Sequence, residues 1–367
     1  MNDRSLFAQT MENSEAVFGN LSFQNHEQVV FCHDPETNLK AIIGIHSTVL
    51  GPALGGTRMW AYTDESAALR DVLRLSRGMT FKAAISGLNL GGGKAVIIGD
   101  ARQHKTPKMM EAFGRFVDSL SGRYITAEDV GINTSDMVSV LKSTKHVTGI
   151  PVEMGGSGDP SPVTAYGVFV GMQAAAAFKW GNDSLQGKRV LVQGVGHVGE
   201  TLVKHLSEAG ADVFISDIYA DRIAQVSETY RANVVDVNAV YDFDMDIYAP
   251  CALGATLNDQ SIGSLKAQIV AGAANNQLAN EDKHGQMLVD KGILYAPDFL
   301  INAGGLINVY SEIAHYDRAE ALRKTEGIRE TALHIFETAS KNKITPHQAA
   351  LQVAAQRVEN AHLAKKN

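Results

Sequence analysis

The chain is poor in cysteine, has no long apolar run and carries no excess of positive charge. Its two cysteines, Cys32 and Cys251, show neither the spacing of a disulfide framework nor that of metal ligands, so we expect reduced thiols, no bound metal and a cytoplasmic location. No apolar stretch approaches the ~20 residues that cross a membrane, and the N-terminus lacks the apolar core of a signal peptide. The net charge of −7 argues against binding to nucleic acid.

Length and patterning indicate two α/β domains. The 367 residues are enough for two domains of ordinary size, and strand-like and helix-like segments alternate along most of the chain, which predicts largely parallel sheets. The segment Ser157-Gly-Asp-Pro-Ser-Pro162 marks a break between them. We therefore expect an N-terminal domain of residues 1–150 and a second domain of residues 151–341, separated by a cleft. The last segment, 342–367, has no core of its own and is expected to be a helix that packs back on the first domain.

A glycine-rich loop in the second domain lies between an expected strand and an expected helix. Its residues are Gly194, Val195, Gly196, His197, Val198 and Gly199. The first glycine permits a tight turn, the second lets the backbone approach a pyrophosphate, and the third lets helix and strand pack closely. Asp217, which ends the next strand 18 residues later, would bind the ribose hydroxyls and repel a 2′-phosphate. The pattern predicts a Rossmann-type domain that binds NAD rather than NADP; a glycine turn without a ligand is the alternative.

Two further loops of small residues follow expected strands of the second domain, at residues 249–254 and 271–276. An open α/β sheet binds its ligand at such carboxyl ends, so we expect both loops near the cofactor. In the first loop, Cys251 and Ala252 are candidate cofactor contacts. No histidine–aspartate pattern accompanies Cys251, so we interpret it as a small packing residue rather than a nucleophile.

Two lysines that lie 12 residues apart in the first domain have unusual surroundings: Lys82 closes Gly78-Met-Thr-Phe-Lys82, and Lys94 follows three glycines. A lysine that stays charged can hold a carboxylate, whereas a second cation beside it is pushed toward the neutral amine, which can act as a base. The glycine run is no P-loop, because a leucine stands where that motif needs glycine and alanine follows the lysine. Asp129 follows at the end of an expected strand. The alternative is that none of the three has a role in catalysis. Lys82 would then be an ordinary lysine at a helix end, Lys94 a solvated lysine and Asp129 a helix cap.

Five segments together resemble the amino acid dehydrogenases of the glutamate/leucine/phenylalanine/valine group, and the leucine dehydrogenase branch above all. The segments are Gly51-Pro-Ala-Leu-Gly-Gly-Thr-Arg-Met-Trp60, Gly78-Met-Thr-Phe-Lys82, Leu90-Gly-Gly-Gly-Lys94, Thr126-Ala-Glu-Asp129-Val-Gly131 and Asn302-Ala-Gly-Gly305. The resemblance implies reversible, NAD-dependent oxidative deamination of an L-amino acid to a 2-oxo acid and ammonium. It also implies a homo-oligomer, often an octamer, assembled through an N-terminal domain that binds the substrate as well.

The resemblance implies roles for three charged residues. Lys82 would stay charged and bind the substrate α-carboxylate. Lys94 would activate the water that attacks the imino carbon and would protonate the carbonyl oxygen in the reverse direction. Asp129 would exchange a proton with the substrate amino group or ammonia.

Five further positions match family positions near the substrate or the cofactor. Gly55 and Met79 match positions near the substrate, and Thr164 matches a threonine near the nicotinamide carboxamide. Either Asn275 or Asn276 orients the substrate amino group or the nicotinamide ribose.

The side-chain pocket that the resemblance implies is apolar throughout: Leu54, Ala127, Leu306 and Val309. Such a pocket favours a branched or bulky apolar substrate over glutamate, and one methylene there is worth only ~1–3 kcal/mol, so leucine, isoleucine and valine are all expected substrates. Leu306 stands where leucine enzymes usually carry a valine, which keeps phenylalanine or valine dehydrogenase open. An NAD-binding sensor without turnover is the alternative outside enzymes, and the intact charged residues argue against it.

Overall fold

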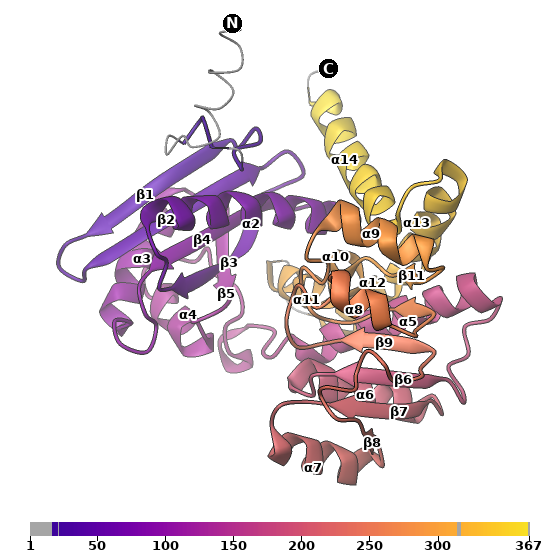
Figure 1. The fold of residues 1–367 in the computed structure, drawn as a ribbon. Coiled ribbons are helices and arrows are strands. Elements are labelled where there is room, and N and C mark those ends of the chain that lie inside the picture. Colours follow the sequence, from indigo (N-terminus) through magenta and orange to yellow (C-terminus); the bar gives the residue numbers. More distant parts are fainter. Residues whose placement is uncertain (1–16, 21, 314–316, 366–367) are drawn as a thin grey trace, which may run out of the picture. The chain divides into compact units, whose positions relative to one another are not determined.

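The computed structural model describes residues 17–20, 22–313 and 317–365 (Figure 1). The chain forms two compact units. Unit 1 comprises Met1–Gly158, Glu312–Tyr316 and Arg357–Asn367, and unit 2 comprises Asp159–Ser311 and Asp317–Gln356. Over the described ranges, no helix is both long and apolar enough to span a membrane.

Unit 1 contains a five-stranded mixed sheet with the order β1-β2-β4-β3-β5. The strands are β1 (Gln28–Asp34), β2 (Leu39–Ser47), β3 (Ala53–Trp60), β4 (Gly91–Ile98) and β5 (Tyr124–Glu128). β1 pairs with β2 in antiparallel fashion, as does β2 with β4, whereas β3 lies parallel to both β4 and β5. The β1–β2 connection is a tight hairpin in which Asn38 has a positive φ of 55°. The two antiparallel pairs, β1–β2 and β2–β4, make the first sheet mixed rather than largely parallel.

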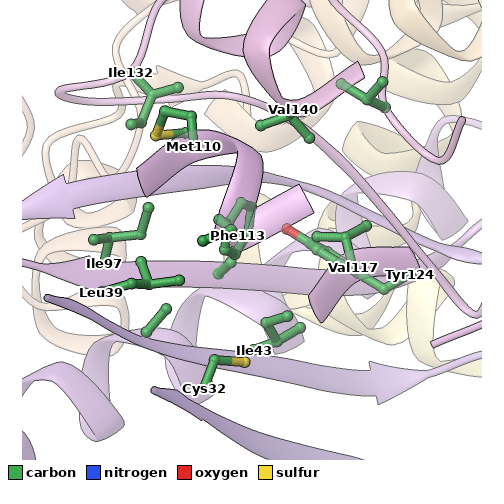
Figure 2. Packing of buried hydrophobic residues seen from close by; sticks show 14 of the residues in the cluster. Cys32, Leu39, Ile43, Ile97, Met110, Phe113, Val117, Tyr124, Ile132 and Val140 are labelled. Carbon is green, nitrogen blue, oxygen red and sulfur yellow. The ribbon is translucent and has the colours of Figure 1, made fainter. Parts of the chain in front are cut away.

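Helices cover both faces of this sheet (Figure 1). They are α2 (Glu65–Ile85), α3 (Pro107–Ser119) and α4 (Thr134–Leu141), and a short 3-10 helix, η1 (Val152–Met154), follows. Because neighbouring side chains of a strand point to opposite faces, Ile42 packs in the α2 cluster while Ile43 packs in the cluster with α3 and α4. Figure 2 shows the second cluster, in which Phe113 and Val117 of α3 lie against the strands. The start of α3 is set by Thr106, whose side chain accepts a hydrogen bond from the Met109 N–H.

Unit 2 contains a six-stranded sheet with the order β11-β10-β9-β6-β7-β8, and all its pairs are parallel. The strands are β6 (Arg189–Gln193), β7 (Asp212–Ser216), β8 (Asn233–Val234), β9 (Ile247–Pro250), β10 (Ile269–Val270) and β11 (Leu294–Tyr295). Numbered from β6, this is the order 3-2-1-4-5-6 of a doubly wound dinucleotide-binding sheet, with the switch point beside β6. The predicted α/β class with a Rossmann-type second domain is therefore confirmed.

The helices of unit 2 lie before, between and after its strands along the chain, and those between strands form the crossover connections that parallel strands require. They are α5 (Ser161–Trp180), α6 (His197–Glu208), α7 (Ala220–Tyr230), α8 (Asp259–Ser264), α9 (Glu281–Asp290), α10 (Asp298–Ile301), α11 (Gly304–Ile313), α12 (Arg318–Glu326), α13 (Ile328–Asn342) and α14 (Pro346–Ala364). α5 begins with a proline in its first turn and ends at Gly181, whose φ is 78°. α14 contributes its last part, from Arg357 on, to unit 1.

Candidate active site

In unit 1 the two predicted catalytic side chains form an ion pair. The Nζ of Lys94 lies 2.6 Å from the Oδ2 of Asp129, and only 8 % of the Lys94 side chain is exposed. Lys94 lies in β4, while Asp129 directly follows β5, and β3 lies between these two strands. Parallel pairing of β3 with both neighbours therefore places the lysine and the aspartate on either side of β3 and close together.

Asp129 has a second cationic partner, which was not predicted from the sequence. The Nε of Arg58, in β3, donates a hydrogen bond of 3.2 Å to the same Oδ2 of Asp129. Burial by itself raises the pKa of the Asp129 carboxyl, but the charges of Lys94 and Arg58 outweigh that effect and hold this pKa below its ordinary value. The site therefore holds Asp129 as a carboxylate.

Arg58 is itself held from its other side. Its Nη1 donates to the Oδ2 of Asp71 in α2 at 3.1 Å, and the hydroxyl of Tyr62 donates to the same oxygen at 2.7 Å. The signal in the sequence was an arginine inside a strand of otherwise small and apolar residues, Ala53–Trp60. A charge in such a strand requires a buried partner, but the spacing along the chain does not say which carboxylate supplies it.

Glycines bring the helix that carries Met79 and Lys82 close to the sheet. A Cβ at Gly92 would lie 2.1 Å from the backbone nitrogen of Thr80 in α2, and a Cβ at Gly55 would lie 1.8 Å from the carbonyl oxygen of Gly93. The Met79 side chain lies beside Gly55, 3.2 Å from where its Cβ would be. Strands and helix thus touch without intervening side chains, and the predicted substrate residues Gly55 and Met79 adjoin each other.

The remaining predicted residues of unit 1 lie in the same strands and helix. Lys82 is in the last turn of α2 and is partly buried. Leu54, in β3, and Ala127, in β5, are both buried, with exposed fractions of 2 % and 7 %.

In unit 2 the glycine loop follows β6 and leads into α6. Gly194 has a φ of 96°, and a Cβ there would lie 2.6 Å from the Cβ of Ala252. A Cβ at Gly199 would lie 1.9 Å from the Gly194 carbonyl oxygen. Both positions therefore require glycine for the fold alone.

Gly196 is different, because none of the described residues excludes a side chain there. Its φ is −70°, and a Cβ would approach only the guanidinium of Arg222, at 3.7 Å. Gly196 also precedes the first residue of α6, His197, at a helix N-terminus that favours a negative charge. The open space above this glycine fits the phosphates of a dinucleotide, which the sequence pattern predicts at this place.

Asp217 lies beside this loop. Its Oδ2 accepts a hydrogen bond of 2.8 Å from the Val195 N–H, and its Oδ1 accepts one of 3.0 Å from the Tyr219 N–H. The carboxylate is thus fixed at the end of the second strand of the nucleotide-binding order, where a ribose is held in such sheets.

The other predicted residues of unit 2 follow β9 and β10 or flank α11. Burial raises the pKa of the Cys251 thiol to about 12, which fits a packing residue and not a thiolate nucleophile. Asn302 donates from its Nδ2 to the Oδ1 of Asn275 at 2.7 Å, so the orientation of Asn275 is fixed. Asn276 instead occupies a turn with a φ of 52°. Thr164 donates from its Oγ1 to the Pro160 carbonyl at 3.0 Å.

Leu306 and Val309 lie three residues apart on α11 and are buried, with exposed fractions of 6 % and 9 %. The four predicted pocket residues are thus divided between the two units: Leu54 and Ala127 belong to unit 1, and this pair belongs to unit 2.

A doubly wound sheet with this glycine loop, together with a buried lysine–aspartate pair in a second unit, defines the class of nicotinamide-dependent dehydrogenases. Residues 26–146 match the Glu/Leu/Phe/Val dehydrogenase dimerisation domain, and residues 155–221 and 217–366 match the Glutamate/Leucine/Phenylalanine/Valine dehydrogenase family. The chain therefore belongs to the Glu/Leu/Phe/Val dehydrogenase family, and it is an amino acid dehydrogenase. The family resemblance drawn from the five sequence segments is confirmed, and the sensor alternative is not retained.

Relatives match along nearly the whole chain. Leucine dehydrogenase of Thermoactinomyces intermedius is 52 % identical over 343 residues, which cover 94 % of this chain and 93 % of that protein. Leucine dehydrogenase of Bacillus subtilis (strain 168) is 53 % identical over 335 residues, covering 91 % and 92 %. The crystal structure of L-tryptophan dehydrogenase from Nostoc punctiforme superposes with a TM-score of 0.83 at 48 % identity, covering 92 % of this chain and 97 % of that chain.

Proposed function

We propose that this enzyme catalyses the NAD-dependent, reversible oxidative deamination of branched-chain L-amino acids, with leucine as the preferred substrate and valine and isoleucine as further substrates. The observation that carries the proposal is the ion pair between buried Lys94 and partly buried Asp129, because folding alone does not require two charged groups beside the glycines of β4. The identity of about 52 % to leucine dehydrogenases supports the choice of substrate.

Three side chains of unit 1 do the acid–base and binding work. Lys82 binds the substrate α-carboxylate, which fixes the α-carbon in place. Asp129, held as a carboxylate by its two cations, accepts a proton from the substrate amino group. In its neutral form, Lys94 takes one proton from the water that adds to the imino carbon. Asp129 then returns its proton to the nitrogen, the C–N bond breaks, and the departing ammonia takes the hydroxyl proton, so that nitrogen leaves as ammonium and the water oxygen becomes the carbonyl oxygen of the 2-oxo acid. Bound NAD supplies the hydride acceptor for the α-carbon.

Unit 2 holds the cofactor in this proposal. The loop of residues 194–199 receives the pyrophosphate, since Gly196 leaves that space open, and Asp217 binds the ribose hydroxyls. The other cofactor contacts we propose are Thr164, Cys251, Ala252 and Asn275. Asn275 is preferred over Asn276 for orienting the substrate amino group or the nicotinamide ribose, because Asn302 fixes its amide.

The proposed substrate class follows from the residues that the family resemblance assigns to the side-chain pocket. Leu54, Ala127, Leu306 and Val309 offer no charge or hydroxyl to a side-chain carboxylate, which disfavours glutamate. Phenylalanine or valine dehydrogenase activity is the second candidate, because Leu306 resembles the residue of phenylalanine enzymes. A relative named L-tryptophan dehydrogenase is 48 % identical, so aromatic amino acids are to be tested as substrates alongside the branched-chain ones.

The deciding experiment is NADH formation at 340 nm in alkaline buffer with L-leucine, L-valine, L-isoleucine, L-phenylalanine, L-tryptophan and L-glutamate. We expect turnover with the three branched-chain substrates and little with glutamate. Higher kcat/KM for an aromatic substrate than for leucine would replace the substrate proposal and leave the dehydrogenase mechanism in place.

Replacing Lys94 by alanine tests the assigned base. We expect Lys94→Ala to lower kcat by at least about a thousandfold, because it removes the proton acceptor for water, while the Kd for NADH from fluorescence titration stays unchanged. Lys142→Ala, which breaks the surface pair with Glu111 in the same unit, is the matched control and should retain turnover. More than a tenth of wild-type kcat in Lys94→Ala would remove Lys94 from the role of base.

Replacing Asp217 by alanine tests cofactor choice. We expect Asp217→Ala to weaken NADH binding by about tenfold and to let NADPH bind, because the carboxylate that repels a 2′-phosphate is gone. Asp212→Ala, at the exposed start of the same strand, is the control. An unchanged ratio of the Kd values for NADH and NADPH would show that Asp217 does not contact the ribose.

We further propose that unit 1 mediates assembly into a homo-oligomer, with an octamer as the expected state. The match of residues 26–146 to a dimerisation domain supports this assignment. Sedimentation velocity of the full chain would count the subunits.

A further inference from the structure

The two lysines of the proposed substrate site lie on either side of the connection between α2 and β4 in unit 1, which we call the joint. Lys82 lies in the last turn of α2, and Lys94 is the fourth residue of β4. Only residues 86–90 separate the helix from the strand. The distance between the two amines therefore depends on how firmly this short joint is held.

Arg357, in the C-terminal helix α14, donates hydrogen bonds to the last turn of α2 and to the joint. The Nη1 of Arg357 donates to the carbonyl oxygens of Ala84, at 2.8 Å, and Ala83, at 3.3 Å, while its Nη2 donates to the Oδ1 of Asn89 at 3.2 Å. These partners are 268 to 274 residues away along the chain. One planar guanidinium thus connects the last turn of the helix to the segment that enters the strand.

The joint also rests on the strand that carries Gly55. A Cβ at Gly51 would lie 2.1 Å from the Asn89 carbonyl oxygen, and the Gly91 N–H donates to the Pro52 carbonyl at 2.9 Å. Movement of the joint would therefore shift Lys82, Lys94 and the glycine edge of the sheet relative to one another.

The position of Arg357 matches what a helix C-terminus attracts. The last carbonyl groups of α2 carry partial negative charge, and a cation there is favourable. The Ala83 and Ala84 carbonyls already accept turn hydrogen bonds from the Leu88 and Gly87 N–H groups, so the guanidinium adds a second partner to each. The arrangement fixes the end of the helix more firmly than the turn alone.

We propose that Arg357 is a positioning residue of the substrate site, through which the C-terminal segment Arg357–Asn367 sets the placement of Lys82 relative to Lys94. The proposal rests on the proposed function for the roles of the two lysines. It predicts that the affinity for the amino acid depends on a side chain that does not touch the amino acid.

The first test separates KM from kcat. Because Lys82 is proposed to hold the carboxylate in the ground state and the transition state alike, we expect Arg357→Gln to raise KM for the amino acid by about tenfold with kcat changed by less than about threefold. The Kd for NADH should stay unchanged. Arg329→Gln, which breaks the pair with Asp183 in unit 2, is the matched control and should leave the KM for the amino acid unchanged.

Chemical rescue distinguishes positioning from stability. In Arg357→Ala, millimolar guanidinium should lower the raised KM toward the wild-type value, because the ion can occupy the place of the lost side chain. The same guanidinium should leave the wild type and Arg329→Ala without any improvement. All assays are run at least about 15 °C below the Tm of each variant.

Hydrogen–deuterium exchange provides a readout that needs no turnover. We expect faster exchange in peptides covering residues 82–94 of Arg357→Gln than of the wild type or Arg329→Gln. Faster exchange with an unchanged KM would reduce Arg357 to a structural residue, and unchanged exchange would overturn the proposal altogether. If the wild type deaminates no amino acid in the panel, the proposed function fails on that result, whereas exchange still decides whether Arg357 holds the joint.

Discussion

Two glycine-rich segments, one in each unit, have glycine for opposite reasons. In β4 of unit 1 a Cβ at Gly92 would strike the Thr80 backbone at 2.1 Å, and one at Gly93 would strike the Tyr124 ring at 2.6 Å. In the loop of unit 2 a Cβ at Gly196 would meet nothing closer than the Arg222 guanidinium at 3.7 Å. The first segment is filled by the protein itself, whereas the second leaves a space that the protein does not use.

The difference shows when a glycine indicates a ligand site and when it indicates only close packing. Gly92 is required for packing, so its presence says only that strand and helix touch. Gly196 has an ordinary φ of −70° and free space around it, so the fold gives no reason for glycine there. A ligand gives one, since a pyrophosphate needs close approach to the backbone. Substitutions at the two sites should therefore damage different properties.

The largest effect is expected from Gly92→Ala. The added methyl group would meet backbone atoms of α2, which cannot move aside as a side-chain end could, so we expect a loss of about 3 kcal/mol or more and a Tm lower by about 10 °C. Differential scanning calorimetry of the purified variants measures the shift.

Gly78→Ala is the matched control for that substitution. Gly78 lies two residues before Thr80 in α2, and a Cβ there would have no neighbour within 4 Å among the described residues. Replacing a helical glycine by alanine should then raise stability by up to about 1 kcal/mol. Equal Tm values for the two variants would contradict the packing argument.

The sequence predicted local features well because their information is local. The loop of residues 194–199 and Asp217 were predicted as cofactor residues from spacing alone, since strand, turn and helix adjoin each other along the chain. Lys82, Lys94 and Asp129 were singled out as candidate site residues because each stands in an unusual short segment. The ion pair between Lys94 and Asp129 was not predicted and comes from the structure.

What the sequence did not predict depends on long-range partners. Arg58 meets Asp129 across 71 residues, and Arg357 meets Ala84 across 273. Neither pairing has a spacing that distinguishes it from any other arginine and acceptor in the chain. The mixed first sheet was missed for a related reason: β2 pairs with β4 across a long stretch of sequence, and strand patterning does not tell whether such a pair is parallel or antiparallel.

The close packing of unit 1 around Thr80 also predicts an effect of pH on stability, which is smaller than the effect of Gly92→Ala and larger than that of Gly196→Ala. Behind the Gly92–Thr80 contact, the Nδ1 of His46 lies 2.8 Å from the Thr80 hydroxyl. Burial, together with the charges of His26 and Arg77, lowers the pKa of His46 to about 4, although the hydrogen bond to the Gln24 carbonyl and the charge of Glu27 oppose the shift. Between pH 6.5 and about 4 the unfolded chain binds a proton at this histidine and the folded chain does not, so stability falls as the pH falls through that window.

The measurement for His46 is the Tm as a function of pH. We expect its contribution to the loss of stability to be about 2 kcal/mol between pH 6.5 and 4, after allowance for partial exposure of the ring. His46→Gln should remove that contribution from the dependence of Tm on pH. His33→Gln, which replaces an exposed histidine of β1, is the control and should keep the wild-type dependence. A slope in His46→Gln equal to that of the wild type would exclude His46 as the titrating group.

The smallest effect, and the one that completes the comparison, is expected from Gly196→Ala. The backbone there already has a conformation that alanine adopts, so we expect a Tm within about 3 °C of the wild type. The methyl group would instead occupy the space proposed for the pyrophosphate, and we expect the Kd for NADH from fluorescence titration to rise about tenfold, which is 1.4 kcal/mol. Gly263→Ala, at a position where a Cβ would meet none of the described residues within 4 Å, controls for a glycine-to-alanine change elsewhere in unit 2. Unchanged NADH affinity in Gly196→Ala would mean that the open space is not the phosphate site, and a loss of Tm as large as that of Gly92→Ala would mean that the two glycine segments do not differ in the way described.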